Sequence, residues 1–167
     1  MDEAFDLARE ALAAGEVPIG CVFTHQGSIV ARSRNTVTET KNGTRHAELN
    51  CIDQVLEANS KEKAEQIFRE MTVIATVEPC ILCLAALRKL GVRNLIYGCS
   101  NDKFGGCGSV LDIHHMAAYD GELAITKGVR AEEAINLIKT FYTGLNPNAP
   151  ITRSNKKKKL ESSTAPQ

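Results

Sequence analysis

The sequence predicts a three-layer α/β/α domain with a mixed central sheet. Three observations lead to this prediction: two β-branched segments separated by a tight turn, a later alternation of strand-like and helical segments, and a length of 167 residues, which suits one domain. A short turn joins antiparallel strands, whereas parallel strands need a longer crossover, usually through a helix. The sheet should therefore begin with an antiparallel hairpin and continue with parallel strands between helices.

The first half of the chain supplies a helix, the hairpin and a second helix. Apolar side chains recur at helical spacing over residues 2–14. The segments PIGCVFT and SIVARS are strand-like, and the HQG between them predicts the hairpin turn. From about His46 the helical period returns. We expect Thr44 to cap this helix, because a threonine hydroxyl can accept from free backbone N–H groups.

The second half alternates strands and helices. After SKEKAEQIFRE, which we interpret as a charged connector, TVIATV has the unbroken apolar character of a central strand. A helix should begin at Pro79, and its sequence ILCLAALRKL is apolar nearly all round, which predicts burial. NLIYG predicts another strand, NDKFGGCGSV a glycine-rich loop and ELAITKG a weak strand, and the last helix should start near Ala131.

The C-terminal segment differs in composition from the rest of the chain. From Pro147 onward five basic residues stand against one acidic residue, a net of +4, which leaves −4 elsewhere because the whole chain is neutral. The segment also lacks apolar side chains to bury. We therefore expect one folded domain over residues 1–146 and a disordered basic tail over residues 147–167.

Composition also excludes some classes of protein. No apolar run approaches the roughly 20 residues that span a membrane, and the acidic start MDEAFDLAREALAAGE matches neither a secretory signal nor a transit peptide. We expect a cytosolic or nuclear protein, in which the six cysteines stay reduced rather than forming disulfides.

Two of those cysteines, Cys80 and Cys83, form a CxxC pair at the expected start of a helix. The partial positive charge there favours thiolate, which suits a nucleophile, a redox pair or a metal ligand. A redox pair should lie in a thioredoxin-like context and leaves the upstream HAE unexplained. His46 of HAE supplies a third ligand, and three ligands with one open position are typical of catalytic zinc. Glu48 can then move protons of the water at that position.

The combination of HAE and PCILC resembles the zinc-dependent cytidine and adenosine deaminases. The similarity extends through EVPIGCVF, TRHAELNCIDQ, TVEPCILC, NDKFGGCGSVL, RAEEAINLIKTFY and NPNAP, and it is strongest to the eukaryotic tRNA wobble-adenosine deaminases. The segment DIHHMAAYDGE departs from the family pattern.

This resemblance implies a function and a set of site residues. It implies a cytidine-deaminase-like fold, Zn²⁺ on His46, Cys80 and Cys83, and hydrolytic deamination of adenosine with Glu48 as proton shuttle. It further implies substrate contacts at the following residues: Val17, Pro18, Asn35, Ala47, Phe104 and Gly105. Purely structural roles are the alternative: an ordinary turn residue at Asn35, strand entry at Val17 and Pro18, and a loop that needs positive φ for FGGCG.

The resemblance also implies partners. The substrate would be tRNA, and a related, catalytically silent subunit would complete a heterodimer, which agrees with the negative charge outside the tail. Lys156, Lys157, Lys158 and Lys159 could contact RNA phosphates, act in nuclear import or simply be solvated.

Two other functions stay open from the sequence. A deaminase of free cytosine, cytidine or guanine would use the same zinc and glutamate, and a non-catalytic zinc-binding partner subunit would be expected to lack Glu48. The remaining histidines, His25, His114 and His115, are not needed for the site, and we expect no second metal there.

Overall fold

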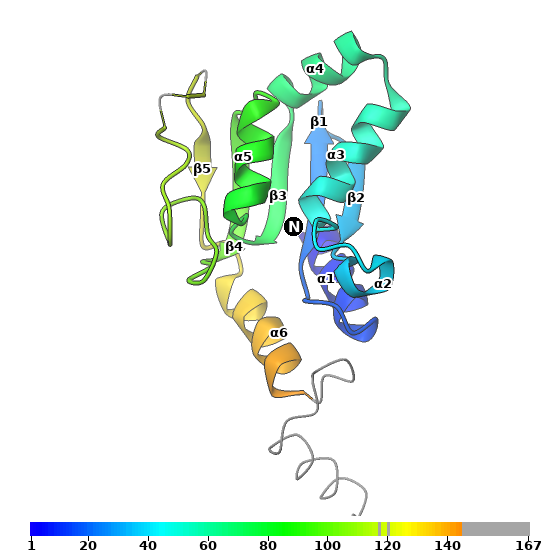
Figure 1. The fold of residues 1–167 in the computed structure, drawn as a ribbon, viewed down its shortest axis with the longest axis vertical. Helices are drawn as coiled ribbons and strands as arrows, with labels where there is room; N and C mark the ends of the chain where they lie inside the picture. The colour runs from blue at the N-terminus through cyan, green and yellow to red at the C-terminus, as the bar shows by residue number, and fades with distance from the viewer. Residues whose placement is uncertain (117, 120, 145–167) are drawn as a thin grey trace, which may run out of the picture.

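The computed structural model describes residues 1–116, 118–119 and 121–144, and it has the expected mixed sheet between helices (Figure 1). The strands are β1 (Gly20–His25), β2 (Ser28–Arg34), β3 (Thr72–Val77), β4 (Asn94–Cys99) and β5 (Ala124–Thr126). Their order in the sheet is β2-β1-β3-β4-β5. β1 pairs antiparallel with β2 and β3, whereas β3, β4 and β5 run parallel. The predicted fold class is confirmed.

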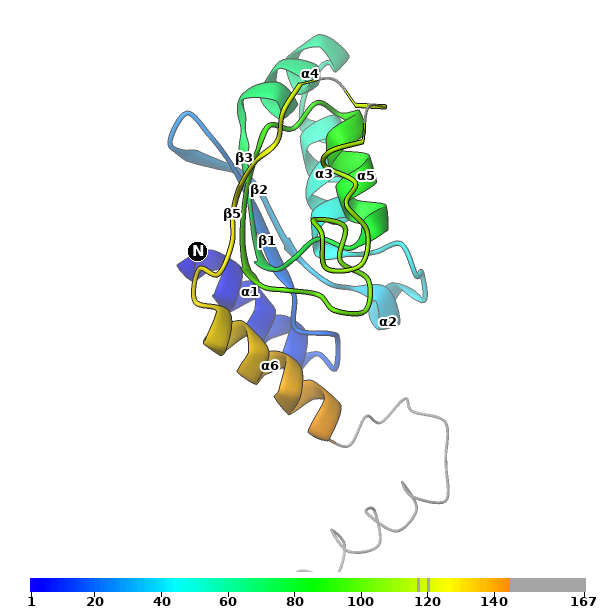
Figure 2. The ribbon, with the colours of Figure 1, turned by 90° about the vertical axis from the view of Figure 1, so that its left-hand side faces the viewer.

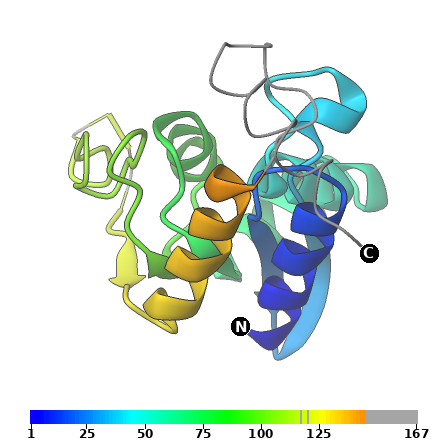
Figure 3. The ribbon, with the colours of Figure 1, turned by 90° about the horizontal axis from the view of Figure 1, so that it is seen from below.

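Helices cover both faces of the sheet (Figure 2). One face carries α3 (Ala47–Ala58), α4 (Lys61–Glu70) and α5 (Ile81–Lys89); the other carries α1 (Asp2–Ala13) and α6 (Ala131–Thr143). Figure 3 shows α1 and α6 lying side by side beneath the sheet. A short helix, α2 (Val37–Thr40), precedes α3. The main core lies between the sheet and α3, α4 and α5, where Phe23, Phe68 and Leu84 are fully buried.

The N-terminal helix lies unusually close to the sheet at Gly20. A Cβ atom at this position would lie 2.0 Å from the carbonyl oxygen of Ala4 and 2.8 Å from the amide nitrogen of Ala8. No real side chain tolerates such contacts with backbone. A glycine is therefore required where α1 crosses the start of β1.

The interpretation of SKEKAEQIFRE as a connector is wrong, because this segment forms α4. The hydroxyl oxygen of Ser60 accepts from the backbone N–H of Lys63, which caps the helix, and Ala64, Ile67 and Phe68 are buried. These three residues occupy one helical face. The many charged residues around them concealed that pattern.

The start and the burial of α5 also differ from the expectation. The helix begins at Ile81 with Cys80 as its N-cap, so Pro79 lies before the helix rather than in its first position. Nor is α5 buried all round, since the side chains of Ile81 and Leu82 are 36% and 47% exposed. Both exposed residues lie in the first turn of the helix, beside the pocket described below.

The predicted Thr44 cap is likewise wrong. The N-cap of α3 is His46, and the hydroxyl of Thr44 donates instead to Oδ1 of Asn42. The backbone N–H of Ala47 donates to the side-chain Oδ1 of Asn35 (2.9 Å), which directly follows the end of β2. A residue distant in sequence thus replaces the expected local cap.

Among the described residues, no helix combines the length and the hydropathy needed to cross a bilayer. The proposed basic tail lies outside the described residues, so the division at residue 147 stays a prediction.

Candidate active site

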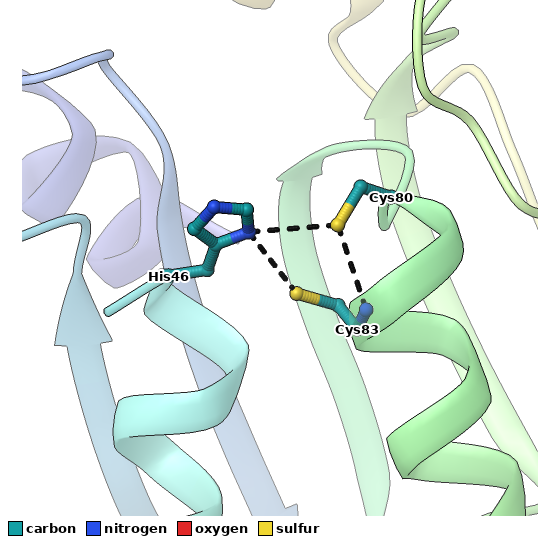
Figure 4. A group of neighbouring side chains, drawn as sticks. All are labelled: His46, Cys80 and Cys83. Carbon is teal, nitrogen blue, oxygen red and sulfur yellow. Dashed lines mark hydrogen bonds between the residues drawn. The ribbon is translucent and has the colours of Figure 1, made fainter. Parts of the chain in front are cut away.

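The predicted metal ligands converge where the N-termini of two helices meet. His46 precedes α3, and Cys80 and Cys83 lie at the start of α5, directly after the carboxyl end of β3 (Figure 4). The Nδ1 atom of His46 lies 3.5 Å from Sγ of Cys80 and 3.4 Å from Sγ of Cys83. The loop after a parallel strand is the usual place for a site in an α/β fold, because the strand ends bring such loops together.

These distances suit a tetrahedral zinc ion. Bonds of about 2.3 Å to sulfur and about 2.0 Å to nitrogen, at tetrahedral angles, place a sulfur and a nitrogen donor about 3.5 Å apart. The two observed separations are within about 0.2 Å of that value. All three donor atoms lie within 4.8 Å of one another. Two thiols and one imidazole also form a soft donor set that zinc prefers.

Protonation within the cluster shows how strongly these donors interact. Hydrogen bonds with Cys83 and, second, with His46 lower the pKa of Cys80 to about 4, although desolvation acts in the opposite direction. The hydrogen bond between the two cysteines, together with burial, raises the pKa of Cys83. The pKa of His46 is raised mainly by its hydrogen bond with Cys80. A bound metal ion would require all three donor atoms to be deprotonated.

Glu48 is the second residue of α3 and is almost fully buried, with 3% of its surface exposed. Burial raises the pKa of its carboxyl group, and the negative charge of Cys80 acts in the same direction. A buried carboxyl group beside the metal ligands can hold and release a proton, which is the role predicted for it.

Asn35 joins the end of β2 to the start of α3. Its backbone N–H donates to the carbonyl oxygen of Ile19 (3.1 Å), and its side-chain Oδ1 accepts from Ala47. The side chain is therefore fixed in one orientation at the edge of the metal cluster. Within the described part of the chain its Nδ2 group has no hydrogen-bond partner, so this group is available to a ligand.

A cavity of about 830 Å³ lies beside the metal-ligand cluster and is lined by both polar and apolar residues. Val17, Asn35, His46, Glu48 and Phe104 line it, as expected for a substrate pocket. Its remaining walls come from segments distant in sequence, including these residues: Ile19, Leu82, Asn101, Asp102, Lys103, Ile135, Ile138, Lys139 and Tyr142.

Three of the predicted substrate contacts do not line this cavity. Pro18 is buried beside it, and the backbone N–H of Ala47 already donates to Asn35. Gly105 packs against the carboxylate of Glu78, where a Cβ atom would lie 2.5 Å away. Pro18, Ala47 and Gly105 therefore lie outside the lining of the cavity.

Sequence reasoning missed the contribution of α6 to the pocket. Ile138 and Tyr142 are four residues apart, a spacing that predicts one apolar helix face packed into a core. The side chain of Tyr142 is nevertheless 62% exposed. The apolar spacing was visible in the sequence, whereas the choice between core and pocket depends on where the helix lies.

The additional histidines lie apart from this cluster. His25 Nε2 pairs with Glu70 Oε2 at 2.8 Å. His114 and His115 both pair with Asp112, at 2.7 and 3.0 Å. Each of these imidazoles therefore lies beside a carboxylate, which His114 and His115 share, and none of them lines the cavity.

Comparison with known proteins supports this assignment of the site. Residues 1–99 match the family model described as the cytidine and deoxycytidylate deaminase zinc-binding region, and the matched part contains His46, Cys80 and Cys83. The chain belongs to this deaminase family. The deaminase is a zinc-dependent enzyme, and these three residues are positioned to bind the ion.

Several relatives are similar over nearly the whole deaminase chain. The tRNA-specific adenosine deaminase 2 of Xenopus tropicalis is 47% identical over 162 residues, which cover 94% of this chain and 95% of the relative. The Danio rerio protein of the same name is 48% identical over 154 residues, or 90% of this chain and 72% of the relative.

Solved structures show the same fold. A structure from a study of A-to-I editing by tRNA:A34 deaminases superimposes with a TM-score of 0.74 and 30% identity, over 82% of this chain and 96% of that chain. A guanine deaminase from Nitrosomonas europaea shares the fold at 17% identity, with a TM-score of 0.66 over 86% of this chain and 82% of that chain.

Proposed function

We propose that this deaminase converts adenosine to inosine at the wobble position of tRNA anticodon loops. The observation that carries the proposal is the convergence of His46, Cys80 and Cys83 beside the buried Glu48 at one end of an open cavity. The choice of substrate is supported by the similarity to relatives named tRNA-specific adenosine deaminase.

His46, Cys80 and Cys83 would hold the zinc ion. When bound, the ion supplies a Lewis acid with an open position, which provides hydroxide near neutral pH. Glu48 would accept one proton from water and deliver it to N1 of adenine. It would then take the second proton from the new hydroxyl group on C6 and deliver it to the amine, which leaves as ammonia when the C6–N bond breaks. Burial of Glu48 suits this role, because it brings the pKa of the carboxyl group closer to neutral pH.

Asn35 orients the base in this proposal. Its Oδ1 atom is held by the backbone N–H of Ala47, which leaves the Nδ2 group to donate to an acceptor on the purine. Val17 and Phe104 provide apolar walls on the cavity surface. Pro18, Ala47 and Gly105 contribute by fixing the backbone around these contacts.

An adenosine in an anticodon loop suits such a cavity. The base is already unpaired, so placing it in a buried site requires only its removal from the stack of neighbouring bases. The cavity is also open to solvent beside two cationic side chains, Lys103 and Lys139, which can lie near the RNA backbone.

We further propose that the deaminase acts as a heterodimer with a related, catalytically silent subunit. The chain outside residues 147–167 carries a net charge of −4, which is unfavourable for holding a whole tRNA. A second subunit would supply much of the positively charged surface. Lys156, Lys157, Lys158 and Lys159 would add phosphate contacts from the tail.

The test is an assay of purified, zinc-loaded deaminase, alone and co-expressed with related deaminase-like subunits. Sequencing should show adenosine-to-inosine conversion at the wobble position of tRNA transcripts, and no conversion at adenosines in their stems. Free cytosine, cytidine, guanine and adenosine serve as competing substrates. Turnover of a free base or nucleoside without conversion of any tRNA would refute the proposal.

A further inference from the structure

Glu78 is a buried carboxylate outside the metal cluster that the mechanism above does not use. It lies between the end of β3 and the start of α5 and is only 1% exposed. Its backbone N–H donates to the carbonyl oxygen of Cys99 (2.8 Å), which extends the pairing of β3 and β4 by one residue. An ionised group at such depth needs compensating partners.

Those partners are the N–H groups of one loop. Oε1 of Glu78 accepts from the backbone of Cys107 (2.8 Å) and Ser109 (3.3 Å). Oε2 accepts from the backbone N–H of Asn101 (2.9 Å) and from the hydroxyl of Ser109. No ion pair involves Glu78 among residues 1–116, 118–119 and 121–144. Backbone dipoles of residues 101–109 therefore stabilise the carboxylate.

The glycines of this loop reflect the same arrangement. A Cβ atom on Gly105 would lie between 2.5 and 2.6 Å from the carboxylate atoms of Glu78, although Gly105 does not have positive φ. Space for the carboxylate, rather than backbone conformation, therefore requires a glycine here. Only Gly108, with φ of 114°, shows the positive φ expected for FGGCG among the three glycines of that motif.

The loop in turn forms one wall of the substrate cavity. The segment 101–104 lines the cavity and is closed on itself, because Oδ1 of Asn101 accepts from the N–H of Phe104 (3.1 Å). It is also tied to α5, since the N–H of Ile81 donates to the carbonyl oxygen of Phe104 (2.8 Å). Asn101 also donates from Nδ2 to the backbone carbonyl oxygen of Glu78 (3.4 Å), so residue 78 holds the wall through both its backbone and its carboxylate.

We propose that Glu78 is a positioning residue that sets the cavity wall 101–104 and thereby the affinity for the nucleotide substrate. The four hydrogen bonds of its carboxylate all go to the loop, so it acts through the wall rather than on the reacting atoms. The inference rests on the deaminase function proposed above, and it names a determinant of substrate binding that is separate from Glu48.

The substitution Glu78→Gln tests this role with almost no change of shape. A glutamine has one acceptor oxygen, so either the N–H of Asn101 or the N–H groups of Cys107 and Ser109 must face an NH₂ group. The hydroxyl of Ser109 can rotate to accept from that NH₂ group, whereas the N–H of Asn101 cannot. The glutamine should therefore release Asn101, and with it the wall 101–104.

We expect KM for a tRNA substrate to rise about tenfold, the effect of losing one buried hydrogen bond, while kcat stays within about threefold of the wild-type value. Zinc content should stay at the wild-type level, and amide hydrogen exchange should accelerate in residues 101–104. A lower melting temperature with unchanged KM would overturn the proposal, because it would show a purely structural role. Loss of zinc would overturn it as well.

The matched control is Arg88→Lys. Arg88 is another buried charged side chain, at the opposite end of α5, where it donates to the carbonyl oxygens of Val92 (3.1 Å) and Gly121 (2.5 Å). This variant should lower the melting temperature and leave KM unchanged. An equal rise in KM would attribute the effect to general destabilisation and refute the role of Glu78.

Two further measurements keep the inference testable. If Glu78→Gln does not fold, Ser109→Ala removes only one hydroxyl contact and should raise KM by about threefold; an unchanged KM would count against the proposal. If wild-type protein converts no tRNA, the proposed function fails by itself. The inference is then decided by binding of purine ribonucleoside to the zinc-loaded proteins, with about tenfold weaker binding expected for Glu78→Gln and equal binding contradicting it.

Discussion

The first turn of α3 places three functional roles on neighbouring residues. His46 provides a metal ligand from the N-cap, Ala47 fixes Asn35 through its backbone N–H, and Glu48 points its carboxyl group into the buried side of the helix. Because the helix starts at a defined residue, the imidazole and the carboxyl group have a fixed spacing. This spacing would let the short HAE segment supply both a metal ligand and the proton carrier proposed above.

Glu48→Gln should reduce turnover strongly without releasing zinc. The amide keeps the shape of the side chain but cannot accept and return a proton, so we expect kcat to fall by about 10²–10⁴-fold. Metal content is measured by atomic absorption and turnover by inosine formation. The control is Glu57→Gln, on the exposed side of the same helix. A zinc-loaded Glu48→Gln enzyme with wild-type turnover would disprove the assigned role.

Cys107 makes stability sensitive to alkaline pH. Burial, followed by the nearby charge of Glu78, raises the pKa of its thiol to about 12 from an ordinary value of 9.0. The folded state therefore favours the neutral thiol, and this contribution is present below pH 9 and lost between pH 9 and about 12, as the unfolded thiol ionises first.

Cys107→Ala should accordingly flatten the decline of stability above pH 9. At pH 10 the wild-type protein should have lost about 1.4 kcal/mol through this thiol, one pKa unit of linkage. Urea unfolding at a series of pH values measures the difference. Parallel pH profiles for the two proteins would show that Cys107 does not contribute.

At the scale of elements, the fold depends on how closely helices approach the sheet. Gly20 allows the backbone of α1 to touch the start of β1, and Gly98 faces α6, where a Cβ atom would lie 3.3 Å from the Cβ atom of Ala134 and 2.3 Å from the carbonyl oxygen of Thr76 in the neighbouring strand. Such contacts fix the position of whole elements rather than single side chains. They hold the layer opposite the metal cluster.

Gly20→Ala should destabilise the protein strongly. The added Cβ atom would overlap the backbone of Ala4 and Ala8, so α1 must move, with an expected cost of about 3 kcal/mol. Gly43→Ala is the matched control, because nothing lies within 4 Å of a Cβ atom there. Its unfolding free energy should stay within about 0.5 kcal/mol of the wild type. Equal unfolding curves for both variants would refute the close contact.

At the scale of the whole molecule, zinc joins α3 to α5. His46 and Cys80 are 34 residues apart in sequence, so their shared ion cross-links two segments that would separate on unfolding. Because the unfolded chain offers no such preformed site, binding energy contributes directly to stability.

Removal of zinc by a chelator should therefore lower the melting temperature, by roughly 10 °C if zinc is present at about a thousand times its Kd. Cys83→Ser should abolish the response, because it removes one ligand. The control Cys107→Ala alters a thiol outside the cluster and should keep the full response. The same melting temperature with and without chelator in the wild-type protein would contradict the cross-link.

Deleting residues 151–167 tests the proposed contact between the lysine tail and RNA. Loss of four phosphate contacts should weaken tRNA binding and reduce the slope of log affinity against log salt by about 3. Filter binding at several salt concentrations measures both quantities. Unchanged affinity and slope would leave solvation or nuclear import as the role of these lysines.

The sequence by itself determined most of the fold and the metal site. Alternating and helical periodicities located the hairpin, β3, β4 and the long helices, because local backbone geometry dictates which side chains share a face. HAE and PCILC identified three ligands and Glu48, since zinc chemistry needs those residue types near helix starts. The charged surface of α4 concealed its short buried stripe, so that helix was missed.

Only the tertiary structure decided how the substrate cavity is walled. Asn35 replaces Thr44 as partner of the α3 N-terminus, α6 contributes Ile138 and Tyr142, and Glu78 holds the wall 101–104. Each of these contacts joins residues from separate elements, and no local spacing encodes such a meeting. Short sequence motifs therefore supply the reactive residues of the site, whereas the shape of the cavity depends on how distant segments pack together.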